Sequence, residues 1–364
     1  MHIGIIRFSS MGDVLLQTPW LAWLKKYNKN IKISFITLSS FRSLVESHPF
    51  IDEGIYIDKK SGLEDIKQLW PLAKQIEKNI DIIFDLHGTL RSSLIRKFCF
   101  SVPVIKVYKR SLQRSLLVRT KWDTLNKLES HHTRIINDFS FLGDSAFDTD
   151  DISEFLKLSF NNPKLALTSL SGSKIYPSTK TSESHKYIAI SPIASFEAKR
   201  WPMSRVRELI KELLKQGDLH QYKIIIVAGP DDTYCDEIFD DELAEEQRVV
   251  NLQGKTSLKE TIEYLKQSEI CITNDTGTSH ISESLGRPVV SIFGPTSESF
   301  GFRPHLDESV ALSALDIKCR PCSATGKKAC TQKELLCMQA VSVDMVMKQV
   351  KRILKKNVLA EAGL

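Results

Sequence analysis

Short apolar runs alternate with amphipathic helical stretches along nearly the whole chain, and this alternation is what most constrains its fold. Runs of this kind, bounded by turn residues, are typical of strands buried on both faces of a parallel sheet. The runs of the first half are Ile3–Arg7, Ile31–Thr37, Gly54–Ile57, Asp81–Leu86 and Val104–Val107. The helical stretches between them include Val14–Lys26, Leu63–Lys78 and Leu90–Phe98. This repetition predicts an α/β domain with a parallel sheet.

The same pattern starts again in the second half of the chain, after a segment of different composition. Residues 168–186 are rich in Ser, Thr, Gly and Pro and lack helical periodicity, which is typical of a linker. The strands predicted beyond it are Tyr187–Ser191, Lys223–Ala228, Val249–Leu252, Ile270–Thr273 and Pro288–Phe293. We therefore predict two doubly wound domains, residues 1–167 and 187–342, facing a cleft in which a ligand binds.

The positive charge of the chain is concentrated in one segment. The whole sequence has 50 Lys and Arg against 44 Asp and Glu, a net charge of +6. Between Arg91 and Arg134 there are eleven Lys or Arg and only two acids, so this segment alone carries +9. Charge separated in this way indicates an anionic partner, and nucleic acid, anionic lipid and phosphorylated sugars all fit. A pair of solvated helices explains the same pattern without a partner.

Several classes of protein are excluded by motifs that the sequence lacks. The phosphate-binding motifs G-x-G-x-x-G and G-x-x-x-x-G-K-[ST] do not occur, which argues against a dinucleotide-dependent dehydrogenase and a P-loop NTPase. The N-terminus has no apolar segment followed by a small-residue cleavage site, and no run of about 18 apolar residues occurs. We therefore expect a cytoplasmic protein, which can still lie peripherally on the inner membrane.

Four of the seven cysteines lie close together in the sequence, at Cys319, Cys322, Cys330 and Cys337. Four thiolates are able to hold a tetrahedral zinc ion, but the second C-x2-C of a zinc ribbon is missing. A redox pair or disulfide, and a loop with packed thiols, are the two other interpretations, and the sequence does not choose among them.

Polar residues follow several predicted strands, at the edge where ligands bind in sheets of this kind. Ser9–Asp13 comes after the first strand, and its Asp13 is either a helix-terminal charge or a general base. Lys199 and Arg200 lie near the N-terminus of a helix, where cations gain nothing from the helix dipole unless they share an anion. Asn274–His280 is a glycine-containing turn that leads into a helix, and Gly294–Thr296 ends the next strand. The last two segments together predict one anion pocket.

These segments, in this order, resemble glycosyltransferase family 9, the ADP-heptose:lipopolysaccharide heptosyltransferases. The resemblance extends nearly from end to end. It is carried by SSMGDVLLQTP and DLHGTLRSSL in the first half, and by AKRWP and NDTGTSHISESLGRPVVSIFGPT in the second. The family implies the GT-B fold, with two Rossmann-like domains and the donor nucleotide held by the C-terminal one. It also implies that the final helix, within residues 343–364, crosses back to pack on the N-terminal domain.

The resemblance further implies roles for individual residues. Asp13 is expected to be the general base of a single inverting displacement that needs no metal and no cofactor. The residues expected to bind the donor are Ser195, Lys199, Asp232, Lys255, Thr256, Asp275, Thr276, Gly277 and His280. Of these, Lys199, Ser195, Thr276, Gly277 and His280 face the diphosphate, Asp275 the heptose, Lys255 and Thr256 the adenine, and Asp232 the ribose.

The acceptor is expected on the N-terminal domain, where the resemblance implies a lipid-anchored lipopolysaccharide core. The residues expected to bind it are Ser10, Gly12, Arg91, Arg110, Arg114 and Arg119. The last three alternate with leucines in a stretch that suits docking on the anionic inner leaflet of the membrane.

We thus predict heptose transfer from ADP-heptose to the lipopolysaccharide inner core, with no nucleic-acid partner. Transfer of a hexose or N-acetylhexosamine by the same fold is one alternative. A non-catalytic basic protein that binds nucleic acid or anionic surfaces is another, and a catalytically dead scaffold is a third. The nucleic-acid alternative predicts strongly salt-dependent binding and no role for Asp13.

Overall fold

The computed structural model describes residues 1–9, 14, 17, 21, 24–25, 28–46, 48, 50–60, 62–106, 111–121, 186–304, 306–314, 316–332 and 334–361. The chain divides into two compact units. One comprises Met1–Arg110 with His131–Tyr176, and the other comprises Ser111–Ser130 with Pro177–Leu364. Each unit is built around its own parallel sheet. The predicted linker, residues 168–186, lies outside the described residues except for Lys186, the first residue of a strand.

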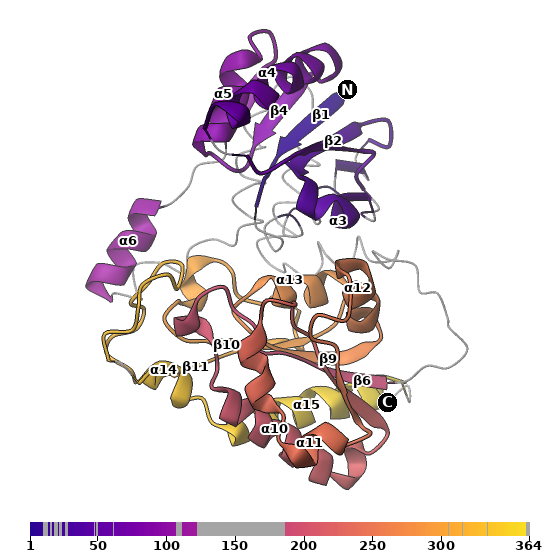
Figure 1. The fold of residues 1–364 in the computed structure, drawn as a ribbon, viewed down its shortest axis with the longest axis vertical. Helices are drawn as coiled ribbons and strands as arrows, with labels where there is room; N and C mark the ends of the chain where they lie inside the picture. Colours follow the sequence, from indigo (N-terminus) through magenta and orange to yellow (C-terminus); the bar gives the residue numbers. More distant parts are fainter. Residues whose placement is uncertain are drawn as a thin grey trace. The chain divides into compact units, whose positions relative to one another are not determined.

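The first unit contains a five-stranded sheet in the order β3-β2-β1-β4-β5, and all its strand pairs are parallel. Its strands are β1 His2–Ile6, β2 Lys32–Leu38, β3 Glu53–Ile57, β4 Ile82–Asp85 and β5 Val104–Lys106. Its helices are η1 Ser39–Phe41, α3 Arg42–Glu46, α4 Gly62–Asn79 and α5 Leu90–Phe98. Helices α4 and α5 pack side by side (Figure 1). All the strands predicted for this half of the chain form. The order of the strands in the sheet reverses between β1 and β4.

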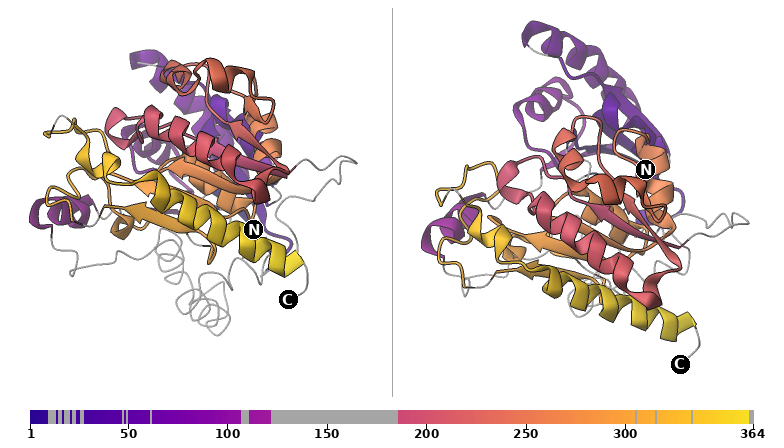
Figure 2. Two further views of the ribbon diagram at one scale, coloured as in Figure 1. Left: turned by 90° about the horizontal axis from the view of Figure 1, so that it is seen from below. Right: turned by 60° about the horizontal axis from the view of Figure 1, so that its bottom comes forward.

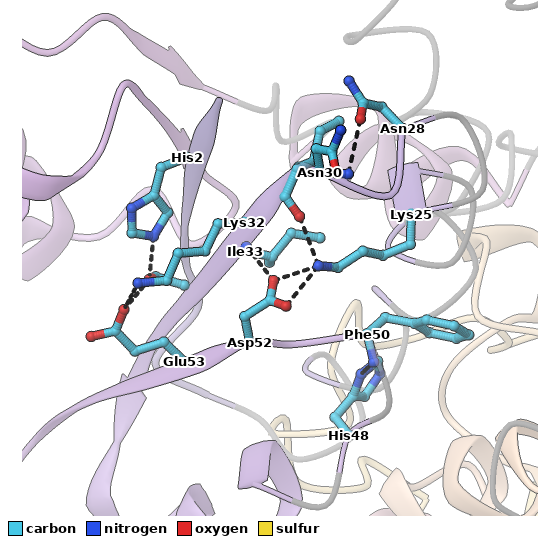
Figure 3. A network of polar contacts seen from close by, with 12 residues as sticks. His2, Lys25, Asn28, Asn30, Lys32, Ile33, His48, Phe50, Asp52 and Glu53 are labelled. Atoms are coloured by element: carbon cyan, nitrogen blue, oxygen red, sulfur yellow. Dashed lines mark hydrogen bonds and ion pairs between the residues drawn. The ribbon is translucent and has the colours of Figure 1, made fainter.

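A polar network ties together the amino-terminal ends of β1, β2 and β3 (Figure 3). Asp52 accepts a hydrogen bond from the backbone N–H of Ile33 (2.6 Å) and forms an ion pair with Lys25 (2.5 Å). The buried Ser34 hydroxyl lies 2.7 Å from Nε2 of His2 and donates to Glu53 at 3.1 Å. The network holds the amino edge of the sheet, opposite the carboxyl edge at which ligands of such sheets bind.

The second unit contains a six-stranded parallel sheet in the order β11-β10-β9-β6-β7-β8. Its strands are β6 Lys186–Ser191, β7 Tyr222–Ile226, β8 Val249–Asn251, β9 Ser268–Asn274, β10 Val289–Phe293 and β11 Val310–Ser313. Its α-helices are α6 Ser111–Thr120, α10 Met203–Lys215, α11 Asp241–Glu245, α12 Leu258–Lys266, α13 Gly277–Ser284, α14 Leu336–Gln339 and α15 Val343–Glu361. Its 3-10 helices are η3 Glu197–Lys199, η4 Gly217–Leu219, η5 Thr233–Ile238 and η6 Glu298–Phe300. The strand order reverses between β6 and β9, so the carboxyl ends of these two strands form the topological switch point, where ligands of doubly wound sheets bind.

The last helix, α15, completes the core of the second unit. Its buried residues Val346, Val350 and Ile353 belong to the same apolar cluster as the residues of β6, β7, β9 and β10. Figure 2 shows α15 alongside α10 in both views, and the two helices are in contact. The described apolar face of this helix is therefore covered by the second sheet and α10, while its packing on the N-terminal domain stays a prediction.

A difference from the prediction concerns α6, which the sequence places in the N-terminal domain. In the structure this helix belongs to the second unit. Its buried Leu117 packs against Phe300, which is also buried, and the Lys121 ammonium donates to the carbonyl of Pro321. The apolar side of α6 is thus used in part for packing within the protein.

We predict that truncating the apolar face of α15 destabilises the second unit. Ile353 is 1% exposed, so Ile353→Ala should lower the free energy of unfolding by about 2–5 kcal/mol. Met345 lies on the same helix but is 37% exposed, and Met345→Ala should change stability by less than about 1 kcal/mol. Urea unfolding of both variants measures the difference. Equal effects of the two substitutions would contradict the packing of α15 described above.

Candidate active site

The switch point of the second sheet is organised by Asn274, the last residue of β9. Its side chain is 1% exposed, and Nδ2 donates to the carbonyl oxygens of Pro192 (2.6 Å) and Ile193 (3.2 Å) in the segment after β6. Its Oδ1 accepts from the backbone N–H of Trp201 at 3.2 Å. One buried amide therefore fixes both ends of the segment 192–201 against β9, and this segment carries the predicted basic residues.

Lys199 and Asp275 meet at this point. The ammonium of Lys199 lies 2.8 Å from Oδ2 of Asp275, and both side chains are about 15% exposed. The Thr296 hydroxyl donates to the same Oδ2 at 2.8 Å. These three residues follow β6, β9 and β10 respectively, so three strand ends converge on one carboxylate oxygen. The ion pair is shielded from solvent more than a surface pair is. Removing one of its two partners would therefore be costly, because the remaining charge would have no counter-ion.

The segment that contains the cysteines packs against this cluster. The Arg320 guanidinium donates to the carbonyl oxygens of Thr296 (3.1 Å) and Ala314 (2.6 Å), as well as to that of Gly294. Gly326 has φ +84°, and a Cβ built on it would lie 2.4 Å from Cδ of Lys199. The segment therefore holds the turn after β10 and also borders the aliphatic part of Lys199.

The N-terminus of α13 opens directly beside Asp275. Thr276 is the N-cap residue but its side chain makes no capping hydrogen bond to the helix. Thr276 Oγ1 instead lies 3.3 Å from the hydroxyl of Thr273. The first-turn amides, from Gly277 onward, are thus left to bind an anion with the support of the helix dipole. His280 follows within the first turn and is half-buried.

A further polar group follows β7. The Asp232 carboxylate accepts from the backbone N–H of Gly229 (2.9 Å) and from the hydroxyl of Tyr234 (2.9 Å). Burial raises the pKa of Tyr234 to about 12, so the hydroxyl stays protonated at neutral pH and remains a donor. The Arg200 guanidinium stacks 3.6 Å from the centroid of the Tyr234 ring and donates to the Ala194 carbonyl. Both oxygens of Asp232 thus already have a partner within the protein.

The other predicted donor-binding residues lie at the same edge of the sheet. Ser195 is exposed and lies four residues before Lys199 in the sequence. Lys255 is exposed and Thr256 half-buried, and both lie between β8 and α12, with the Thr256 hydroxyl 2.9 Å from that of Thr261. The structure brings Lys199 into contact with Asp275, and it places Thr276, Gly277 and His280 on the helix that follows.

The predicted acceptor-side residues are described only in part. Ser10, Gly12, Asp13 and Arg110 lie outside the described residues. Arg91 is held by Asp65 through two hydrogen bonds of 2.7 and 2.9 Å, and its guanidinium lies 5.7 Å from the Phe8 ring centroid. On α6, Arg114 lies over the ring of Phe302 and Arg119 is exposed. Both belong to the second unit, which is a correction to their predicted place in the N-terminal domain.

Some residues of the site were not assigned a role from the sequence. Thr296 and Arg320 are the main ones, together with Asn274 and Gly326. Thr296 carried a signal, because it follows a predicted strand beside the anion pocket. No signal in the sequence indicated Arg320 or Gly326, because their contacts are with residues far away in the sequence.

The four clustered cysteines are free thiols in the structure. Among the described residues, which include all four, no group of three or more His, Cys, Asp or Glu side chains is arranged to hold a metal ion. Burial raises the pKa of Cys337 to about 11, so this thiol is neutral at physiological pH.

Comparison with known proteins identifies the family. The model of glycosyltransferase family 9 (heptosyltransferase) matches residues 69–333. Lipooligosaccharide heptosyltransferase 2 of Campylobacter jejuni is 28% identical over 95% of this chain and 96% of its own length. Lipopolysaccharide heptosyltransferase 1 of Campylobacter coli is 25% identical over 97% of this chain and 99% of its own.

Solved structures show the same fold. The ADP-heptose lipopolysaccharide heptosyltransferase II of Escherichia coli superposes with a TM-score of 0.68 at 19% identity, over 98% of this chain and 99% of that one. A family 9 glycosyltransferase from Veillonella parvula gives a TM-score of 0.68 at 20% identity, over 98% and 97%. The predicted α/β fold of GT-B type, with two parallel-sheet domains, is thereby confirmed. In the described part of the chain, no helix is long and apolar enough to cross a membrane. The match of the family model over most of the chain, together with these relatives, shows that the protein belongs to glycosyltransferase family 9, the heptosyltransferases, and is a glycosyltransferase.

Proposed function

We propose that this enzyme transfers heptose from ADP-heptose to the lipopolysaccharide inner core in a single inverting displacement. The relatives named above are lipopolysaccharide and lipooligosaccharide heptosyltransferases, which supports the sugar and the acceptor class. The observation that carries the proposal is the meeting of Lys199, Asp275 and Thr296 beside the uncapped N-terminus of α13. This cluster offers a cation and free amides for a diphosphate, and a carboxylate for sugar hydroxyls.

The diphosphate of the donor is bound by Lys199, Ser195 and the first turn of α13, which includes Thr276, Gly277 and His280. In the structure the Lys199 ammonium is paired with Asp275. A diphosphate carries more negative charge than a carboxylate, so it draws the ammonium toward itself. Thr296 keeps its hydrogen bond to Oδ2 of Asp275 during this exchange. The half-buried carboxylate therefore never loses all its partners, and its other oxygen accepts from a heptose hydroxyl.

The nucleoside is placed at the outer side of the same sheet edge. Lys255 and Thr256 follow β8, the edge strand, and border the adenine in this proposal. Asp232 follows β7, between the edge strand and the switch point, and contacts the ribose. Its carboxylate is oriented by Gly229 and Tyr234, and each oxygen retains a lone pair for a ribose hydroxyl.

Chemistry at the anomeric carbon requires a base for the acceptor hydroxyl. We assign this role to Asp13, which follows β1 in the first unit by a few residues, with Ser10 and Gly12 contacting the acceptor. The acceptor oxygen forms a bond to the anomeric carbon while its proton passes to the Asp13 carboxylate. The bond from this carbon to the diphosphate breaks, and ADP leaves with the electron pair. Attack from the face opposite the leaving group inverts the configuration.

The negative charge that develops on the leaving diphosphate is stabilised by Lys199 and the α13 N-terminus rather than by a divalent cation. Such preorganised groups lower the barrier because they are aimed at the charge before it forms. The acceptor is a lipid-anchored core, so we place the enzyme at the cytoplasmic face of the inner membrane, in peripheral contact with the anionic leaflet. Arg91, Arg110, Arg114 and Arg119 are the cations proposed for the anionic acceptor.

A panel of sugar nucleotides tests this function. Thermal shift and calorimetric titration should show selective binding of ADP-heptose over UDP- and GDP-sugars, with unchanged affinity in the presence of a chelator. Preferred binding of a UDP- or GDP-sugar would replace the substrate and leave the fold and the mechanism standing. Loss of ADP-heptose binding in chelator would overturn the metal-free mechanism. Absence of any nucleotide binding would overturn the proposed function itself.

A further inference from the structure

Helix α4 of the first unit exposes an apolar stripe in addition to its buried face. Leu69, Leu72, Ala73 and Ile76 are buried against the sheet. Three other apolar residues, at helical spacing, point to solvent: Leu63 is 75% exposed, Ile66 42% and Trp70 49%. Spacings of three and four residues place them on one face of the helix. A helix that packs on its sheet needs only one apolar face, and a second apolar face exposed to water adds nothing to the stability of the protein.

The stripe continues beyond the helix through aromatic contacts. The ring of Trp70 lies 5.1 Å from that of Phe98, at the end of α5. The Lys74 ammonium is 5.3 Å from the centroid of Trp70 and 5.5 Å from that of Phe100, which is 77% exposed. We call Leu63, Ile66, Trp70 and Phe100 the α4 stripe. Large apolar side chains gathered on one exposed helix face, with two aromatic rings beside the same lysine, are typical of an interaction surface.

The charges around the α4 stripe indicate what covers it. On α4 and α5, all of whose residues are described, the exposed charged side chains are four lysines and one glutamate. These are Lys67, Lys74, Lys78, Lys97 and Glu64. One of the lysines, Lys74, forms an ion pair with the less exposed Glu77 at 2.6 Å. Viewed along the helix, Lys67, Lys74 and Lys78 project next to the apolar residues. Tryptophan, phenylalanine and flanking lysines are the composition of a surface that enters the headgroup region of an anionic bilayer. A protein partner of acidic character would not require the exposed aliphatic residues at its centre.

We propose that the α4 stripe and its lysines form the surface by which this enzyme binds an anionic membrane. The rings and aliphatic side chains enter the headgroup region, and the lysines extend their ammonium groups to lipid phosphates. The inference rests on the proposed function only in that a lipid-anchored acceptor requires the enzyme at a membrane. It places the main contact on α4 rather than on α6, whose buried Leu117 packs within the protein.

Flotation of the full-length protein with vesicles tests the proposal. We expect binding to vesicles of phosphatidylcholine mixed with phosphatidylglycerol, weakened by salt, and little binding to phosphatidylcholine alone. Lys67→Gln with Lys78→Gln should lower binding about 25-fold, at about fivefold per lysine. Ile66→Ser with Phe100→Ser should lower it by about tenfold or more. Met345→Ser, an exposed apolar position on α15, is the matched control and should not change it.

The outcomes separate this inference from the proposed function. The two α4 double variants and Met345→Ser should transfer heptose to a delipidated, soluble acceptor at the wild-type rate and melt at the wild-type temperature. Wild-type vesicle binding by both double variants, or its loss only in Arg114→Gln with Arg119→Gln on α6, would overturn the role of α4. The role of α4 in membrane binding would also be overturned if the α4 stripe paired two copies of the protein. In that case the wild type would be a dimer and the α4 variants would be monomers. An enzyme that binds vesicles through α4 but transfers no heptose would refute the function alone.

Discussion

Replacing Lys199 by Met should lower kcat for heptose transfer by about 100- to 1000-fold, the cost of removing one preorganised group from a developing oxyanion. The substitution keeps the length of the aliphatic part and removes only the charge. Donor affinity should fall as well, because the ammonium also contacts the diphosphate in the ground state. Steady-state kinetics with ADP-heptose and a soluble acceptor measure both quantities. Lys215→Met, at an exposed position near the end of α10, is the control and should be indistinguishable from the wild type.

The same substitution removes the partner of Asp275, and this consequence is measurable separately. Asp275 keeps the Thr296 hydroxyl, so the protein should remain folded with a modest loss of stability. Lys199→Arg should recover part of the rate, because the guanidinium restores the positive charge. Recovery should be incomplete, because a planar guanidinium is larger than the compact ammonium that it replaces. A Lys199→Met enzyme that retains near wild-type kcat while folded would show that the leaving group is stabilised elsewhere.

Gly326→Ala should lower kcat/KM for ADP-heptose by about 10- to 100-fold, although Gly326 contacts no substrate in our proposal. A methyl group at this position would lie 2.4 and 2.5 Å from Cδ and Cγ of Lys199, so the lysine must move. Misplacement of a catalytic group by about 1 Å is enough to cost a factor of about 100. The expected readout is a loss of donor affinity and turnover measured at a temperature where the variant is folded.

The backbone of Gly326 introduces a second effect that needs its own control. Its φ of +84° strains any other residue, which costs about 1–2 kcal/mol of stability. Gly286 has a similar φ of +73°, and a methyl group added there would have no neighbouring atom within 4 Å. Gly286→Ala therefore carries the backbone strain without the displacement of Lys199. Equal kinetic losses in the two variants would show that strain, and not the position of Lys199, is responsible.

The sequence predicts the sheets well because buried parallel strands produce apolar runs that turn residues interrupt. It also predicts that Lys199, Asp275 and Thr296 lie at the carboxyl edge of the second sheet, since each follows a strand. It does not predict that Lys199 and Asp275 form an ion pair, because that depends on the strand order that brings β6 and β9 together. The contribution of Arg320 and Gly326 is hidden for the same reason.

The surfaces that cover α15 and α6 could not be predicted from the sequence, for one physical reason. The periodicity of α15 shows that one face is buried but does not show which surface covers it, and the second sheet proved to be that surface. The basic stretch that contains α6 indicates a charged helix, whereas Leu117 decides which unit it joins.

We propose heptose transfer from ADP-heptose with Lys199 and Asp275 as donor-binding residues and Asp13 as the general base. The most direct test incubates the enzyme with ADP-heptose and a lipid-anchored inner-core acceptor, and follows the product by mass spectrometry and its anomeric configuration by NMR. We predict one added heptose per acceptor with inverted configuration, and almost none with Asp13→Asn, which should still bind the donor. Retained configuration, undiminished transfer by Asp13→Asn, or transfer from a different sugar nucleotide only would contradict the account.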